Sequence, residues 1–140
     1  MLEKSERMGG GVKMTGNFGK FIEQKRKALG MTLRGLAAEL NIAPAFMSDI
    51  EKGHRYPPNR DKLYEMAHIL KLKDDDIDKM FDLAAEEREN TVSPDLPEYI
   101  MNNKTARTAL RIARDNNVPE SKWQKVIEML EQEEQENKDE

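Results

Sequence analysis

LRGLAAELNIAPAFMSDIEKG, residues 33–53, is the stretch of this sequence that decides the fold. Thr32, directly before it, is a good N-cap for a first short helix. Asn41 tolerates the left-handed backbone conformation of a tight turn. A second helix follows, because Pro44 suits a first helical turn and Gly53 suits a helix end. The stretch therefore predicts two short helices joined by a tight turn.

The apolar residues of this stretch are spaced to hold the two helices at a fixed angle. Ala37 is small enough for a close crossing, and the larger apolar positions are Leu36, Leu40, Ile42, Met47 and Ile50. A helix-turn-helix needs a tight turn, a small crossing residue and an apolar clamp of this kind. Its second helix, here residues 43–52, protrudes and can enter a DNA major groove. The same apolar set would serve any helical bundle, so the turn and Gly53 carry the DNA interpretation.

This pattern resembles the helix-turn-helix of the lambda repressor/Cro type, the Xre family. The matching residues are Leu36–Ala37, Ile42, Met47–Ser48, Ile50–Glu51–Lys52–Gly53 and a proline a few positions later. The resemblance extends from Phe18 to Leu72, because the flanking helical patterns also fit that family's compact bundle. It implies sequence-specific DNA binding, usually by a dimer on a two-fold operator, and usually repression.

The resemblance also implies which residues meet DNA bases. They are the start and exposed face of the second helix, namely Ala43, Pro44, Ala45, Phe46, Ser48 and Asp49. Many family members carry Gln or Arg where this sequence has Leu33 and Pro44. Ala, Pro and Phe cannot make bidentate hydrogen bonds to a base, although Asp49 can accept one from a cytosine amino group. We therefore expect weak direct readout, with affinity resting on phosphate contacts and DNA shape.

Phosphate contacts are expected on both sides of this helix, where basic residues gather. The candidates are the backbone N–H groups at Thr32, with Arg34, Lys52, His54, Arg55, Arg60 and Lys62. Cationic side chains at such positions bind any DNA sequence, and they make binding salt-dependent. Glu51 is expected to have a structural role, reaching a helix cap or an arginine.

The pattern along the chain predicts an all-α protein with four segments. They are a flexible leader at 1–16, a helix-turn-helix domain at 17–73, a helical extension for dimerisation or regulation at 74–134, and a disordered acidic tail at 135–140. Further helices are expected from Asn17 to a stop at Gly30, after Asn59, from residue 74, and at about 104–116 and 120–134. Met8 and Met14 are alternative starts, so the sequence leaves open whether residues 1–13 are native coding sequence.

Charge is distributed unevenly along the 140 residues, whose formal net charge is −4. Residues 1–73 hold 14 Lys and Arg against 8 Asp and Glu, whereas residues 74–140 hold 9 against 19. This asymmetry suggests that only the first half meets a polyanion, although two solvated surfaces of opposite sign would look the same. Cysteine is absent, which excludes disulfides and thiolate metal sites. With no signal peptide and no membrane-length apolar run, a cytoplasmic protein is expected.

Two patterns mark the C-terminal extension. Four basic residues share one helix face: Lys104, Arg107, Arg111 and Arg114. They could touch flanking DNA, pair with the acidic last helix or a second protomer, or form plain solvated surface. Four apolar residues share a face of the last helix: Trp123, Val126, Ile127 and Leu130. This stripe is expected to bury the helical hairpin on its neighbour, or to serve as a dimer or partner surface.

The sequence shows no catalytic pattern, and no enzyme, cofactor or metal site is expected. His54 and His68 lack ligand spacing, and the acidic run 74–76 suits a helix start better than a calcium loop. The leading hypothesis is a transcriptional repressor that binds DNA as a homodimer. An alternative is an antitoxin that binds its own promoter and covers a toxin with its C-terminal helices. A third possibility is a helical adaptor that binds no DNA.

Overall fold

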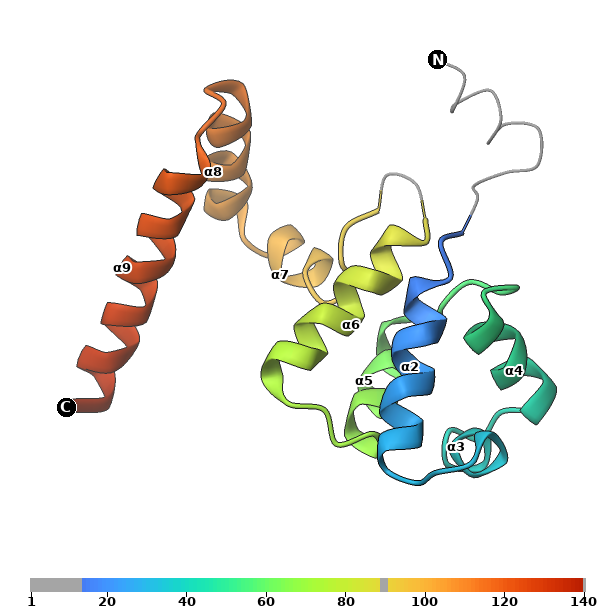
Figure 1. Cartoon of the computed structure of the whole chain (residues 1–140). Coiled ribbons are helices and arrows are strands. Elements are labelled where there is room, and N and C mark those ends of the chain that lie inside the picture. The colour runs from blue at the N-terminus through green and yellow to red at the C-terminus, as the bar shows by residue number, and fades with distance from the viewer. Residues whose placement is uncertain (1–13, 89–90, 140) are drawn as a thin grey trace, which may run out of the picture. The chain divides into compact units, whose positions relative to one another are not determined.

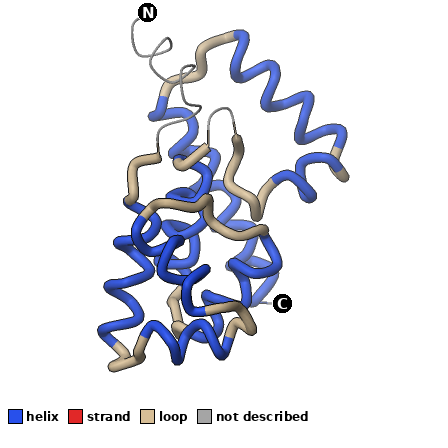
Figure 2. The backbone as a smooth tube through the Cα atoms, turned by 90° about the vertical axis from the view of Figure 1, so that its right-hand side faces the viewer, coloured by secondary structure: helices blue, strands red, loops and turns tan. Residues whose placement is uncertain are grey.

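The computed structural model describes residues 14–88 and 91–139, and its regular secondary structure in those ranges is entirely helical (Figures 1 and 2). This confirms the predicted all-α class. The chain divides into two compact units, Met1–Pro97 and Glu98–Glu140. None of the helices in the described ranges is long and apolar enough to span a membrane.

The first unit is built from a bundle of helices labelled α2 to α6 (Figure 1). Their bounds are α2 Asn17–Ala28, α3 Leu33–Glu39, α4 Pro44–Lys52, α5 Arg60–Ile69 and α6 Asp74–Glu86. The predicted caps are confirmed: the side-chain oxygens of Thr32 and Asn59 accept hydrogen bonds from the backbone N–H groups of Gly35 and Lys62. Asn41 has the expected positive φ, 60°.

Every helix of this bundle contributes to one apolar core. Its largest fully buried apolar side chains are Phe18, Ile22, Leu36, Leu40, Met47, Ile50, Leu63, Met66, Met80 and Phe81. The last two belong to α6, which packs against α2. The structure therefore corrects the predicted boundary after residue 73: α6 lies within the first unit, because its apolar face completes the core. One contact with this core is aromatic: the centre of the Tyr64 ring lies 4.8 Å from the centre of the Phe81 ring.

Glycine allows α2 and α4 to cross at backbone contact. A Cβ atom added to Gly19 would lie 2.2 Å from the carbonyl oxygen of Glu51. α4 then ends at Gly53, whose φ is 80°. The Cα of Gly16 lies 3.2 Å from the position that a Cβ on Gly53 would occupy. This crossing sets how α4 is mounted on the bundle.

Glu87, a buried carboxylate at the end of α6, holds the residues that precede α2. It accepts hydrogen bonds from the backbone N–H groups of Thr15 at 2.9 Å and Gly16 at 3.2 Å. Thr15 and Gly16 close the predicted flexible leader at 1–16. They are held in place, because a carboxylate far away in the sequence accepts hydrogen bonds from their backbone N–H groups. Residues 1–13 lie outside the described part of the chain.

The second unit contains α8, Lys104–Asp115, and α9, Glu120–Asp139. A short helix that the sequence analysis did not predict, α7 at Pro97–Met101, precedes them. α9 runs five residues beyond the predicted end at Glu134, so the expected disordered tail is helical through Asp139. The reason is local: Glu, Gln and Lys favour helix, and Lys138 pairs with Glu134 one turn away at 3.3 Å.

Candidate nucleic-acid interface

The outer face of α4 is open to solvent, while its inner face is buried. The six predicted base-facing residues are all at least partly accessible: Ala43, Pro44, Ala45, Phe46, Ser48 and Asp49. On the inner side, Met47, Ile50 and Glu51 are buried. Phe46 is 38% exposed, so it stands on the outer face rather than in the core. Of these six outward residues, only Ser48 and Asp49 carry polar side chains.

A buried ion pair clamps the inner side of α4 to α2. Arg26 donates from Nε and Nη2 to the two carboxylate oxygens of Glu51 at 2.8 and 2.9 Å. Its Nη1 donates to the carbonyl oxygen of Met31 at 2.9 Å. The pKa of Arg26 is raised above its ordinary value, chiefly by the hydrogen bonds to Glu51, although burial acts in the opposite direction. This confirms the structural role expected for Glu51.

Arg26 itself was not predicted from the sequence. The available signal is its position four residues after the buried Ile22, which places a guanidinium on the inner face of α2. Such a residue needs an acidic partner, and Glu51 is the one that the fold supplies. The pair links α2, the turn at Met31 and α4, so the orientation of α4 does not rest on apolar packing alone.

Arg55 lies over the outer face of α4. Its guanidinium carbon is 4.2 Å from the centre of the Phe46 ring. Its Nη2 is 3.8 Å from Oδ2 of Asp49. The sequence assigned Arg55 to phosphates and the other two residues to bases. The structure brings all three together, and we call them the Phe46–Asp49–Arg55 cluster.

The other residues predicted to meet phosphates differ in how free their side chains are. Thr32, Arg34, Lys52 and His54 are exposed. Lys62, in contrast, donates from Nζ to the carbonyl oxygen of Leu40 at 2.9 Å and so caps the end of α3. The Lys62 ammonium group is therefore engaged within the fold and is less free to contact a phosphate. Arg60 pairs with Asp61 at 3.5 Å.

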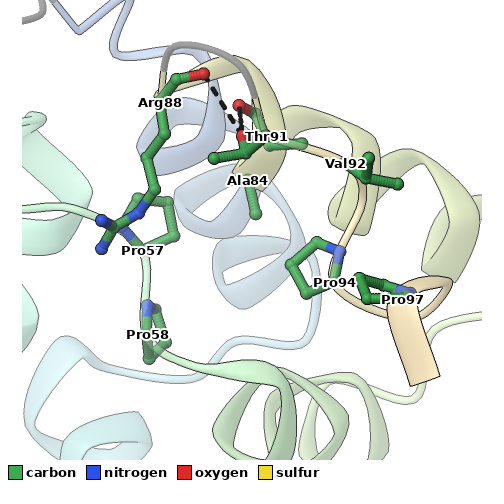
Figure 3. A pocket seen from close by; sticks show the side chains of 9 residues that line it. Pro57, Pro58, Ala84, Arg88, Thr91, Val92, Pro94 and Pro97 are labelled. Carbon is green, nitrogen blue, oxygen red and sulfur yellow. Dashed lines mark hydrogen bonds between the residues drawn. The ribbon is translucent and has the colours of Figure 1, made fainter. Parts of the chain in front are cut away.

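A largely apolar pocket of about 410 Å³ lies beside the loop that follows α4 (Figure 3). Its lining consists of Pro57, Pro58, Ala84, Ala85, Arg88, Thr91, Val92, Pro94 and Pro97. Arg88 stacks on the Tyr56 ring at 4.1 Å, and the Thr91 hydroxyl donates to the carbonyl oxygen of Ala85 at 2.8 Å. None of the predicted site residues lines this pocket.

In the second unit, the predicted apolar stripe is accessible. Ile127 and Leu130 are 46% and 57% exposed, and Trp123 and Val126 are partly exposed. None of the described side chains of this unit is buried. A two-helix hairpin with so little covered apolar surface lacks a core of its own.

The predicted basic stripe is not one uniform surface. Arg107 donates from Nη1 to the carbonyl oxygen of Ile100 at 2.9 Å, so it holds α7 against α8. Arg114 pairs with Asp115 at 3.0 Å, whereas Lys104 and Arg111 are exposed. Across the described residues, no three His, Asp or Glu side chains come together as metal ligands.

A comparison with protein-family models agrees with this geometry. Residues 22–77 match a family model described as helix-turn-helix. A comparison with curated protein sequences gave no match. A solved structure titled "SinR protein/SinI protein complex" is 17% identical, with coverage of 84% of this chain and 98% of that chain and a TM-score of 0.42, values too low to carry an argument about function. Residues 22–77 of this chain thus form a helix-turn-helix domain, the type of domain that the sequence pattern predicts.

Proposed function

We propose that the protein is a repressor that binds a two-fold operator as a homodimer, with α4 in the major groove. The observation that supports this proposal is how α4 is held on the bundle. A buried ion pair and a backbone-contact crossing hold its inner face, and its outer face is open. A rigidly held, protruding helix is what major-groove docking requires. Such a regulator works where the DNA is, in the cytoplasm.

The α8–α9 hairpin is the proposed dimerisation element. Its exposed apolar residues include Leu110, Ile112, Ile127, Met129 and Leu130, and they need a cover in water. Charge favours a second hairpin as that cover. α8 holds four basic residues and one acid, whereas α9 holds seven acids and three lysines. α8 of one protomer beside α9 of another would place opposite charges together.

The test is binding to duplex DNA from upstream of the gene, measured by fluorescence anisotropy over a series of salt concentrations. We expect affinity to fall steeply with salt, because phosphate contacts release counterions. Arg34→Ala removes an exposed residue that is predicted to meet a phosphate. It should weaken binding on every sequence and reduce by about one the slope of log affinity against log salt concentration. Lys79→Ala, which removes a positive charge from α6, is the control and should leave both quantities unchanged. An unchanged slope for Arg34→Ala would contradict the placement of Arg34 at a phosphate.

A second candidate function rests on the same exposed hairpin. An antitoxin would also bind DNA through α4, but it would cover a toxin with α8 and α9 instead of a second copy. The two functions predict different neighbouring genes and different oligomeric states for the purified chain. A short toxin-like reading frame next to the gene, with a monomeric purified chain, would favour the antitoxin. A dimer in isolation favours the repressor, and no salt-dependent DNA binding at all would leave only the adaptor.

A further inference from the structure

We propose that the Phe46–Asp49–Arg55 cluster reads a G·C base pair, with Arg55 donating to guanine and Asp49 accepting from cytosine. The inference rests on the proposed function, because it names what the α4 face recognises. It assigns base readout to Arg55, a residue that lies outside α4.

The first step is the reach of Arg55. Phe46 lies in the first turn of α4, and Arg55 follows three residues after the helix ends. The helix alone separates the levels of Phe46 and Lys52 by about 9 Å along its axis. Even so, the Arg55 guanidinium lies 4.2 Å from the Phe46 ring. Its side chain therefore folds back along α4 and carries its charge to the level of the first turn.

The second step is preorganisation. A guanidinium stacked on an aromatic face keeps its edge N–H groups available for hydrogen bonds. Phe46 and Asp49 are one turn apart, so both lie under Arg55 on the same face. The Phe46 ring lies against the guanidinium, and the Asp49 carboxylate forms an ion pair with its Nη2 at 3.8 Å. A guanidinium held in this way loses less freedom when it makes a bidentate contact.

The third step decides between a base and a phosphate. A phosphate is anionic, so a carboxylate beside the guanidinium would oppose a phosphate contact. The major-groove edge of a G·C pair instead offers two acceptors on guanine, N7 and O6, and one donor on cytosine, the N4 amino group. Arg55 supplies the donors and Asp49 the acceptor. The pair is thus complementary to a G·C edge and poorly matched to a phosphate.

The experiment selects bound sites from random duplex DNA with the wild-type protein and with Arg55→Lys and Asp49→Asn. Lysine keeps the charge but loses the planar fork. We expect the wild-type sites to share a G·C pair. Arg55→Lys should reduce the preference for that pair by a factor on the order of 10–100 while leaving the salt slope unchanged. Asp49→Asn should also weaken this preference.

Arg88→Lys is the matched control, since Arg88 also stacks on an aromatic ring, that of Tyr56, but lies after α6. It should leave base preference unchanged. The inference is overturned if no G·C pair is shared, or if Arg55→Lys weakens all sequences equally. It is also overturned if Asp49→Asn tightens binding to all sequences, as expected for a phosphate contact. In these cases wild-type DNA binding survives, whereas a wild-type protein without DNA binding would remove the proposed function as well.

Discussion

Arg26 and Glu51 place two opposite charges in the interior of the first unit, with side-chain exposures of 9% and 5%. Removing both charges from water is costly, and their two parallel hydrogen bonds offset that cost. The ion pair orients α4 as well as attracting it to α2, because the guanidinium also donates to the carbonyl oxygen of Met31. Apolar side chains in the same place would pack, but they would not specify the rotation of α4.

Arg26→Ala should lower the free energy of unfolding by about 3–5 kcal/mol, because it leaves the Glu51 carboxylate buried and unpaired. Chemical denaturation monitored by circular dichroism measures this change. Lys27→Ala is the control, since it breaks the exposed Lys27–Glu23 pair one residue away. It should cost no more than about 0.5 kcal/mol. Equal costs for the two variants would contradict the clamp.

At the scale of elements, the position of α4 depends on how closely α2 can approach it. Gly19 has no Cβ, so α2 lies directly on the carbonyl groups at the end of α4. Any side chain at this position would meet backbone rather than a movable side chain. The two helices would then have to separate, and the outer face of α4 would turn relative to the bundle.

Gly19→Ala should destabilise the fold by about 3 kcal/mol or more, the upper end of the cost of overpacking. It should also weaken DNA binding at temperatures where the variant is still folded. Thermal unfolding and anisotropy measure the two effects. Gly35→Ala in α3 is the comparison, because its new Cβ would meet two side-chain atoms, the Thr32 hydroxyl oxygen at 3.0 Å and Cγ of Met31 at 3.6 Å. It should change stability by less than about 1 kcal/mol in either direction. If Gly19→Ala is as mild as Gly35→Ala, the crossing does not hold α4.

At the scale of the whole molecule, the two units differ in how they are stabilised. The first has a buried core drawn from α2 to α6. The second has an apolar stripe that remains accessible within its own hairpin. Folding of the first unit is therefore expected to be independent of the chain beyond Pro97, whereas the second needs a partner surface.

Replacing Ile127 and Leu130 together by Asp should convert the proposed dimer to a monomer, because charged side chains cannot be buried in an apolar interface without cost. Light scattering during size exclusion measures the mass. Affinity for a two-fold site should fall by a factor on the order of 10²–10⁴, through loss of avidity. Ser121→Asp with Gln132→Asp adds the same charge on the opposite face of α9 and should leave the mass unchanged. A dimer that survives the first pair of substitutions would place the interface elsewhere.

Much of the fold could be predicted because its signals are local. The caps at Thr32 and Asn59, the turn at Asn41 and the stop at Gly53 each depend on a few neighbouring residues. Leu29 shows the limit of such patterns: it continues the apolar stripe of α2 but is 43% exposed, because it follows the last helical residue.

The sequence by itself determined the helix-turn-helix, since the helical period, the turn conformation and the caps each depend on residues that are close together in the chain. Only the tertiary structure decided that α6 completes the core, that Arg26 pairs with Glu51, and that Arg55 folds back over Phe46. The first two bring together residues far apart in the chain, and the third depends on the direction of a long side chain beyond a helix end. Packing in three dimensions selects such partners, and periodicity along the chain cannot.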